Sequence, residues 1–387
     1  MIGQFMANSN LAEAQRAKND EFYTQYADIE KEISAYLEFN PDVFRGKTLL
    51  LPCDDPEWSN FTRYFAQNFE RFGLKKLIST SYAVESKKYK SGYQPTLFET
   101  RAPYYDDVKT VKNGKIFSLT HDRTGDRKVN VDDLEWHYLA GDGDFRSAEI
   151  KNLRDEADII ITNPPFSLFR ELLAWIFETE KQFVIIGKKN CVTYKEVFPL
   201  FMENKMWSGR TEWAGGMWFE TKDPNDVDKV IDGINMKNVS SVWFTNIDHG
   251  RRHEHIPLMT MADNLKYSKH KEIKGKQSYD RYDNYDAIEV PFTDAIPSDY
   301  EGVMGVPVSF LDKYSPDQFE IVGRCENENL YQLKTKVYTS DECKQAYFDK
   351  FGKKGTYDMN SNGVLLIDGL LEKTYQRVFI KHRKATK

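Results

Sequence analysis

Short runs of apolar residues recur along the first part of the chain and predict the strands of a sheet. The runs lie at 48–51, 76–82, 157–162, 183–187 and 242–246. Aromatic residues repeat at helical spacing from Phe61 to Phe72, and residues 166–177 predict a second, apolar helix. Strands that alternate with helices are typical of parallel strand pairing. The pattern therefore predicts a doubly wound α/β domain with a mostly parallel sheet.

The chain is long enough for two domains, and its pattern changes near residue 250. It has 387 residues and a mass of 45.2 kDa, more than one simple core usually accommodates. Residues 11–39 indicate a polar helix, and residues 86–130, rich in Lys, Tyr, Asp and Gly, indicate an insertion. Beyond residue 250 the alternation of strands and helices is lost. We therefore predict one domain over 1–250 and another over 251–387.

Composition excludes several classes of protein. Apolar residues make up 40% of the chain, with 25 Phe and 22 Tyr, which is enough for a packed interior and excludes a disordered chain. A mean hydropathy of −0.65, with no apolar stretch near about 18 residues, excludes an integral membrane protein. The N-terminus has no basic flank and no apolar block, so no secretion signal is expected. Four widely spaced cysteines favour a reducing cytoplasm over a disulfide framework or a cysteine zinc site.

The net charge of −6 hides an uneven distribution of charged residues. Residues 331–387 carry twelve Lys and Arg against six Asp and Glu, and residues 249–282 carry eight against four. A chain in which one face meets phosphates needs an asymmetry of this kind. Helix faces exposed to solvent explain the uneven charge equally well.

The peptide Asn163-Pro164-Pro165-Phe166 follows a predicted strand directly and precedes a predicted helix. As local structure it is a strand-to-helix turn, with Asn as the cap and Pro in the first helical position. Open α/β sheets, however, place their sites at the carboxyl ends of strands. An Asn oxygen, a Pro carbonyl and an aromatic ring can accept both hydrogens of a planar exocyclic amine and stack on the ring that bears it. The N6 amine of adenine is such a group.

Two acceptors on one amine favour a pyramidal nitrogen, whose lone pair can attack an electrophilic methyl group. Catalysis would then depend on orientation and on preorganised acceptors, with no metal and no covalent enzyme intermediate. The amine proton can leave after methyl transfer, so no strong general base is required.

A second candidate is the Gly-Asp-Gly-Asp-Phe sequence at 141–145. Locally it is a Gly/Asp turn. As a binding site, Asp144 would accept the exocyclic amine of a cofactor's adenine, and Phe145 would pack on the adenine ring. Asp144 precedes Asn163 by 19 residues, which is enough for one crossover and one strand.

A third candidate is Asp54-Asp55-Pro56, directly after the first predicted strand. A phosphate cradle needs glycines and a helix N-terminus without acids nearby, whereas this turn has two carboxylates and no glycine. A cationic ligand fits the turn better than a nucleotide phosphate, and S-adenosylmethionine carries both an ammonium and a sulfonium. An Asp that caps a helix is the structural alternative.

Together these pieces resemble the N6-adenine DNA methyltransferases and, more closely, the EcoRI-type modification methylases. The likeness covers most of the chain and includes residues 20–26, 53–56, 59–61, 73–78, 141–147, 158–169, 194–198, 282–288 and 302–307. All amino methyltransferases share the peptide at 163–166, and the longer runs around it are more specific. The resemblance implies a class I, Rossmann-like fold that uses S-adenosylmethionine to methylate adenine N6 within a specific duplex sequence.

The resemblance also implies roles for individual residues. The catalytic residues would be Asn163, Pro164, Pro165 and Phe166, which would hold the extruded adenine. The cofactor-binding residues would be Phe22, Tyr23, Thr24, Asp54, Asp55, Asp144, Phe145 and Asn163. This sequence departs from the family pattern twice. Acids replace the usual glycine-rich cofactor loop, and the second strand ends at 79–82 without the acid that usually binds the ribose.

An adenine inside a duplex cannot reach such a pocket, so it must rotate out at a cost of about a few kcal/mol. We expect the basic C-terminal region to bind the duplex. Its candidate DNA-binding residues are Arg251, Arg252, Lys266, Lys269, Lys271 and Lys274. The nearby His249, His253 and His255 lack a fourth ligand such as Cys, so we expect no metal site.

The sequence leaves other functions open. The acceptor could be an RNA base or a protein amide, and the acids at 54–55 and 142–144 could bind the metal of a nucleotidyl or glycosyl transferase. A DNA-binding module without catalysis is a third alternative. The intact peptide at 163–166 and the large C-terminal region favour DNA methylation. We expect a cytoplasmic monomer that acts on double-stranded DNA, with a cognate restriction endonuclease as a second candidate partner and no membrane association.

Overall fold

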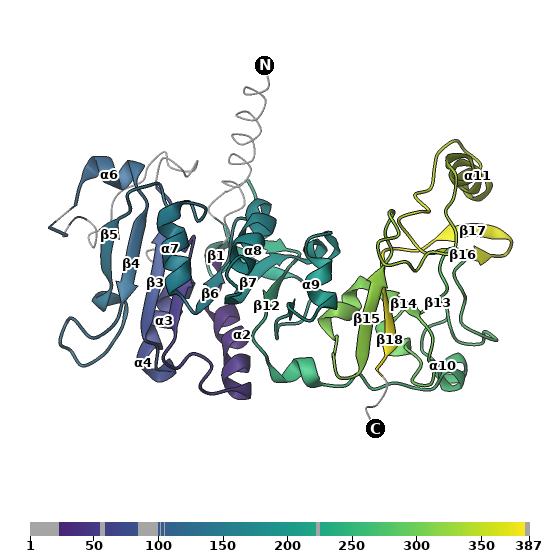
Figure 1. Cartoon of the computed structure of the whole chain (residues 1–387), viewed down its shortest axis with the longest axis horizontal. Coiled ribbons are helices and arrows are strands. Elements are labelled where there is room, and N and C mark those ends of the chain that lie inside the picture. The colour runs from purple at the N-terminus through teal and green to yellow at the C-terminus, as the bar shows by residue number, and fades with distance from the viewer. Residues whose placement is uncertain are drawn as a thin grey trace, which may run out of the picture. The chain divides into compact units, whose positions relative to one another are not determined.

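The structure is a computed structural model that describes residues 23–54, 59–83, 100, 102–103, 105–221 and 225–383. The chain forms two compact units (Figure 1). The first runs to Gly250 without Pro199–Lys205, and the second combines Pro199–Lys205 with Arg251–Lys387. Each unit has its own sheet and its own core of buried side chains.

An eight-stranded sheet forms the centre of the first unit. In spatial order its strands are β5 (Glu135–Tyr138), β4 (Lys115–Leu119), β3 (Lys76–Ser81), β2 (Thr48–Leu51), β6 (Ile159–Thr162), β7 (Gln182–Lys188), β12 (Ser241–Thr245) and β8 (Trp207–Ser208). The central strands β3, β2, β6 and β7 are parallel. The outer strands pair antiparallel on both sides, β4 and β5 next to β3, and β12 between β7 and β8.

The five predicted apolar runs correspond to β2, β3, β6, β7 and β12, which confirms the α/β class. The prediction of a mostly parallel sheet is wrong for the outer strands, where the pairing is antiparallel. Antiparallel neighbours need no crossover helix, so the strand–helix rhythm could not reveal them. In addition, β4 lies within the segment 86–130 that we predicted as an insertion, so residues 115–119 belong to the sheet.

Helices cover both faces of this sheet. On one face lie α2 (Tyr26–Phe39), α3 (Asn60–Gln67) and α4 (Phe69–Phe72), and on the other α7 (Ala148–Glu156) and α8 (Phe169–Phe177). Successive residues of β7 show the division. Val184 and Ile186 belong to the core cluster that includes α2, α3 and α4, whereas Gly187 faces Phe169 of α8. This arrangement agrees with the predicted winding of the chain around both faces.

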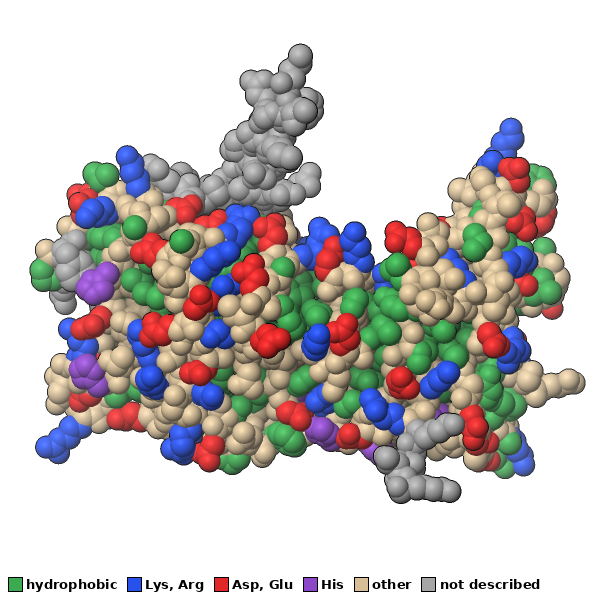
Figure 2. Space-filling view, in the orientation of Figure 1, with side chains coloured by type: hydrophobic (Ala, Val, Ile, Leu, Met, Phe, Trp, Pro, Cys, Tyr) green, Lys and Arg blue, Asp and Glu red, His purple; other side chains and the backbone are tan. Residues whose placement is uncertain are grey.

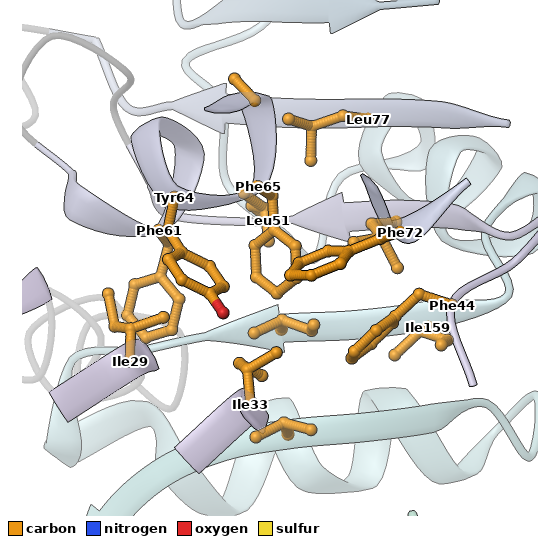
Figure 3. Packing of buried hydrophobic residues seen from close by; sticks show 14 of the residues in the cluster. Ile29, Ile33, Phe44, Leu51, Phe61, Tyr64, Phe65, Phe72, Leu77 and Ile159 are labelled. Carbon is orange, nitrogen blue, oxygen red and sulfur yellow. The ribbon is translucent and has the colours of Figure 1, made fainter. Parts of the chain in front are cut away.

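The aromatic repeat that predicted α3 and α4 is explained by burial. Phe61, Tyr64, Phe65 and Phe72 are each no more than 2% exposed and pack over β2 (Figure 3). Burial of each such side chain contributes about 1.5–3 kcal/mol. Gly73 ends α4 in the left-handed conformation, with φ 63°, which glycine adopts at no steric cost.

A smaller antiparallel sheet completes the first unit. Its order is β1 (Tyr23–Thr24), β9 (Met217–Glu220), β11 (Ile234–Val239) and β10 (Lys229–Ile231). The short helix α6 (Asp107–Lys112) precedes β4, whereas the short helix α9 (Phe198–Met202) belongs mostly to the second unit. No helix in the described part of the chain is long and apolar enough to cross a bilayer.

The second unit contains a four-stranded sheet and a hairpin, none of which the sequence pattern predicted. In spatial order the sheet consists of β13 (Ile288–Glu289), β14 (Met304–Pro307), β18 (Arg377–His382) and β15 (Phe319–Arg324). The hairpin joins β16 (Val364–Ile367) to β17 (Leu370–Lys373). The unit also contains the helices α10 (Met261–Tyr267) and α11 (Ser340–Phe351). Arg377 pairs with Glu289 at 2.5 Å inside this unit, and both side chains are nearly buried. Tyr282 donates a hydrogen bond to the same carboxylate.

A buried carboxylate fixes α2 within the first unit. Glu32 is fully buried, and its carboxylate accepts hydrogen bonds from the Tyr36 hydroxyl at 2.7 Å, the Arg210 amide at 2.7 Å and the Thr211 amide at 2.8 Å. Buried polar groups of this kind are costly unless their bonds are complete. Glu32 therefore determines where α2, and the β1 strand before it, attach to the unit.

We expect Glu32→Ala to lower the free energy of unfolding by about 3 kcal/mol, because it leaves the half-buried Arg210 and Thr211 amides without this acceptor. Thermal denaturation followed by circular dichroism measures the effect. Glu38→Ala, an exposed position on the same helix, is the matched control and should leave the midpoint unchanged. Equal midpoints for the two variants would contradict the role assigned to Glu32.

Candidate active site

The carboxyl ends of the four parallel strands lie at one edge of the large sheet, because parallel strands share their direction. The turns after β2 and β6 are joined directly, since the Thr162 hydroxyl donates to the Pro52 carbonyl at 2.5 Å. The loop at 141–145 reaches the end of β3, where the Ala83 amide donates to the Asp142 carbonyl at 2.7 Å. All three candidate segments found in the sequence thus meet at this edge.

The Asn163-Pro164-Pro165-Phe166 peptide leaves β6 and leads into α8 through a single 3-10 turn, Phe166–Leu168. Both prolines are buried, and Asn163 is half-buried. The Pro165 carbonyl accepts from the Leu168 amide at 2.9 Å and so belongs to the turn. The Pro164 carbonyl accepts no hydrogen bond within the described residues. Of the two prolines, Pro164 is therefore the one that can offer its carbonyl to a ligand.

Phe166 lies between two groups that come from other strands. Its ring meets Phe219 of β9 edge-to-face, with centroids 6.4 Å apart, and the Lys188 ammonium at the end of β7 lies 5.5 Å from its centroid. The ring is 7% exposed. A flat ligand can stack on Phe166 only if a neighbouring group moves.

Asp54 is held in a buried hydrogen-bond network after β2. Its side chain, 5% exposed, accepts from the Ser59 hydroxyl at 2.9 Å, and its carbonyl accepts from the Ser79 hydroxyl of β3. Ser59 also caps α3 by accepting from the Phe61 amide. Asp54 therefore lies just before α3, in a turn that these hydrogen bonds hold in place. The strand end that lacks the family's ribose-binding acid instead supplies Ser79, which holds this turn to β3.

Strand β1 brings Tyr23 and Thr24 to the same region. Thr24 pairs with Phe219, the residue that contacts Phe166, and its carbonyl accepts from the Asn60 side chain at 2.8 Å. Asn60 is the first residue of α3, directly after Ser59. The structure thus connects Thr24 both to the Phe166 ring and to the Asp54 turn. Phe22 and Asp55, the remaining residues of these two segments, lie outside the described residues.

In the loop at 141–145 the two predicted ligand residues differ. Asp144 forms a bidentate ion pair with Arg146, at 2.6 Å for the shorter contact, and this hydrogen bond raises the pKa of the Arg146 guanidinium. Phe145 is fully buried, and its ring meets Trp175 of α8 edge-to-face. The packing of Phe145 on a cofactor ring therefore stays a prediction, and in this structure the ring has no exposed surface.

Asp144 nevertheless lies close to the turn after β2. Burial raises the pKa of the Tyr82 phenol well above its ordinary value, and the nearby Cys53 and Asp144 raise it further. Tyr82 follows β3, so the Asp144 loop and the β2 turn both lie near the end of this strand. Cys53 itself has φ 72°, a left-handed conformation that residues other than glycine adopt rarely.

The predicted DNA-binding residues divide into two groups. Arg251 forms an ion pair with Asp312 at 2.9 Å with 9% of its side chain exposed, and the buried Arg252 donates to the Asn204 side chain. A contact of these two arginines with DNA stays a prediction, and in this structure internal partners occupy their guanidinium groups. The four exposed lysines lie on α10 and the turn after it, at Lys266, Lys269, Lys271 and Lys274.

The distribution of charged side chains on the surface does not identify a face that would bind nucleic acid. On the face drawn in Figure 2, Lys and Arg side chains are interspersed with Asp and Glu. Lys269, for example, forms an ion pair with Asp294 at 2.7 Å. Among the histidines, the buried His249 bonds to the Ser208 carbonyl, and His253 bonds to Asp317. The described part of the chain holds no cluster of His, Cys, Asp and Glu suited to a metal ion.

Sequence reasoning missed several residues of the site. Ser59 and Asn60 lie in a run that carries the family resemblance, but nothing in the pattern showed that they hold the turn and β1. Phe219 and Lys188 come from strands whose neighbours could not be inferred. A Ser before an aromatic helix is a signal for a helix cap, and it could have identified Ser59.

Comparison with known proteins gives a consistent result. A family model described as the adenine-specific methyltransferase EcoRI matches residues 10–383. The chain is 41% identical over 321 residues to the Type II methyltransferase M.EcoRI of Escherichia coli, covering 81% of this chain and 89% of that protein. It is 32% identical over 334 residues to the Type II methyltransferase M.MpnI of Mycoplasma pneumoniae, covering 84% and 89%. No solved structure matches.

We expect Gly143→Ala to destabilise the first unit by about 2 kcal/mol. Gly143 has φ 89°, and a Cβ there would strike the Ser81 carbonyl at the end of β3. Gly125→Ala is the matched control, because Gly125 has φ 75° but open space around it. Thermal denaturation should show a larger effect for Gly143→Ala. The same effect in both variants would mean that backbone strain, and not the close approach to β3, limits this position.

Proposed function

The chain belongs to the EcoRI family of adenine-specific methyltransferases, and we propose that it transfers a methyl group from S-adenosylmethionine to the N6 amine of an extruded adenine. As a member of this family it is a site-specific DNA methyltransferase. The observation that carries the detailed proposal is the position of the Asn163-Pro164-Pro165-Phe166 turn beside the Pro52–Asp54 turn. This position supports the proposal, because the acceptors for an amine would then lie beside Asp54, an acid suited to a cationic donor.

In the proposed reaction the adenine amine donates one hydrogen to the Asn163 side-chain oxygen and the other to the Pro164 carbonyl. Phe166 stacks on the adenine ring, and Pro165 holds the turn through its bond to Leu168. The two acceptors draw the amine out of the ring plane, so that the nitrogen lone pair points at the incoming methyl group. The nitrogen gains positive charge during transfer and then releases a proton to solvent.

The cofactor proposal rests on the chemistry of the donor set. S-adenosylmethionine supplies a methyl group on a sulfonium, and its cationic end suits a turn with acids and no glycine. The Asp54 side chain accepts from Ser59 and the Thr24 carbonyl accepts from Asn60, so both segments are fixed before any ligand binds. Asp144 would have to share its carboxylate between Arg146 and the cofactor. Turns at the carboxyl edge of parallel strands support a class I, Rossmann-like arrangement.

We further propose that the second unit binds the DNA duplex. Its exposed lysines on and after α10 can neutralise phosphates, whereas Arg251, Arg252 and Arg377 serve its interior. Extrusion of the target adenine costs about a few kcal/mol, which contacts with the DNA backbone offset. A monomer in the cytoplasm, with a cognate restriction endonuclease acting on the same sequence, completes the proposal.

We expect Asn163→Ala to reduce the rate of methyl transfer by about 100- to 1,000-fold, as removal of one preorganised hydrogen-bonding group does in other enzymes. Incubation of plasmid DNA with labelled S-adenosylmethionine, followed by sequencing that maps the modified adenines, measures the activity of both proteins. Calorimetric titration should show nearly unchanged cofactor affinity. Asn152→Ala, an exposed position on α7, is the control. Joint loss of activity and cofactor binding would indicate a folding role for Asn163 instead.

We expect DNA affinity to fall steeply with salt despite the acidic isoelectric point, because local phosphate contacts set counterion release. Substitution of Lys266, Lys269, Lys271 and Lys274 by Gln should reduce the salt slope by about 0.9 for each phosphate that a lysine no longer neutralises. The same substitution of four exposed lysines of the first unit, Lys75, Lys109, Lys112 and Lys128, is the control. A slope unchanged by the α10 substitutions would remove this surface from the DNA-binding role.

A further inference from the structure

Lys188 lies in the candidate site, although the chemistry described above does not use it. It is the last residue of β7, the strand next to β6, and its ammonium lies 5.5 Å from the centroid of the Phe166 ring. Such a distance is within the range of a cation–π contact, which is weak where solvent has access. Lys188 therefore touches the ring on which the adenine would stack.

The adenine cannot reach this ring without a rearrangement. Phe166 is 7% exposed, and of the two contacts described for its ring, Phe219 is fully buried within a paired strand. Lys188 is half-buried at a strand end and has a flexible four-carbon stem. Of these two contacts, Lys188 is thus the less costly one to displace.

Lys188 also has no carboxylate partner among the residues that the structure describes, whereas Arg146, the cation directly after the loop at 141–145, pairs with Asp144. A cation that leaves the ring needs another anion. The adenine amine cannot serve, because it donates hydrogens and gains positive charge during methyl transfer. The phosphates that flank the same nucleotide can serve, because the sugar ties them to the base and the base carries them to the rim of the site.

On these grounds, and resting on the proposed function, we propose that Lys188 is a positioning residue that pairs with a phosphate flanking the extruded adenine. Its ammonium covers Phe166 in the absence of DNA and exchanges the ring for the phosphate when the base arrives. A charge-assisted bond to phosphate is stronger than an exposed cation–π contact. The exchange therefore favours the extruded state of the nucleotide.

Lys188→Met tests the proposal, because methionine is of similar length and keeps the contact with an aromatic ring but removes the charge. With a duplex that contains the mapped recognition sequence, affinity should fall about tenfold. The slope of log affinity against log salt should decrease by about 0.9, the value for one phosphate. Lys188→Arg, which keeps the charge, should restore the slope. Lys189→Met is the matched control, a neighbouring lysine with similar burial and no described ring contact.

A second measurement uses DNA in which one flanking phosphate is replaced by a neutral methylphosphonate. The wild-type enzyme should bind about tenfold more weakly when one of the two flanking positions is neutral, and Lys188→Met should show no further decrease there. Wild-type indifference to both replacements overturns the proposal, even if Lys188→Met proves unstable. An unchanged salt slope in a folded Lys188→Met also overturns it, and assigns Lys188 to ring packing alone. Failure of the wild-type enzyme to methylate any plasmid adenine would instead overturn the proposed function.

Discussion

The shared direction of β3, β2, β6 and β7 is the constraint on which the candidate site depends. Parallel strands end at the same edge, so turns far apart in sequence open toward the same space. The bond from Thr162 to the Pro52 carbonyl then fixes the turn after β6 against the turn after β2. The turn that carries Asp54 and the turn that carries Asn163 become neighbours for this reason, before any ligand is present.

The features that sequence reasoning predicted are those with a local physical cause. A central strand buried on both faces must be an apolar run, so β2 and β6 could be predicted closely. Two prolines after such a strand end it and stiffen the turn, so the peptide at 163–166 could be placed at a strand end. Aromatic residues at helical spacing predicted α3 and α4 because they must face one core.

The features that it missed depend on which partner a residue meets. Phe145 is as plausible on a ligand as in a core, and only Trp175 of α8 shows that it is buried. Arg251 and Arg252 contribute to a basic segment of the sequence. Inside the second unit, however, Arg251 pairs with Asp312 and Arg252 donates to the Asn204 side chain. A count of charges cannot separate a solvated cation from a buried one. Antiparallel pairing of β4 also depends on a neighbour that the sequence pattern does not reveal.

The candidate site contains both rigid and movable parts. Methyl transfer without a metal or a covalent intermediate depends on acceptors that do not have to reorganise. The buried prolines and the Ser59 and Ser79 bonds to Asp54 meet that requirement. A base that rotates out of a duplex, however, needs access to the Phe166 ring, which is 7% exposed. Hence one group beside Phe166 has to be both mobile and better satisfied by DNA than by the protein, and a lysine at a strand end has both properties.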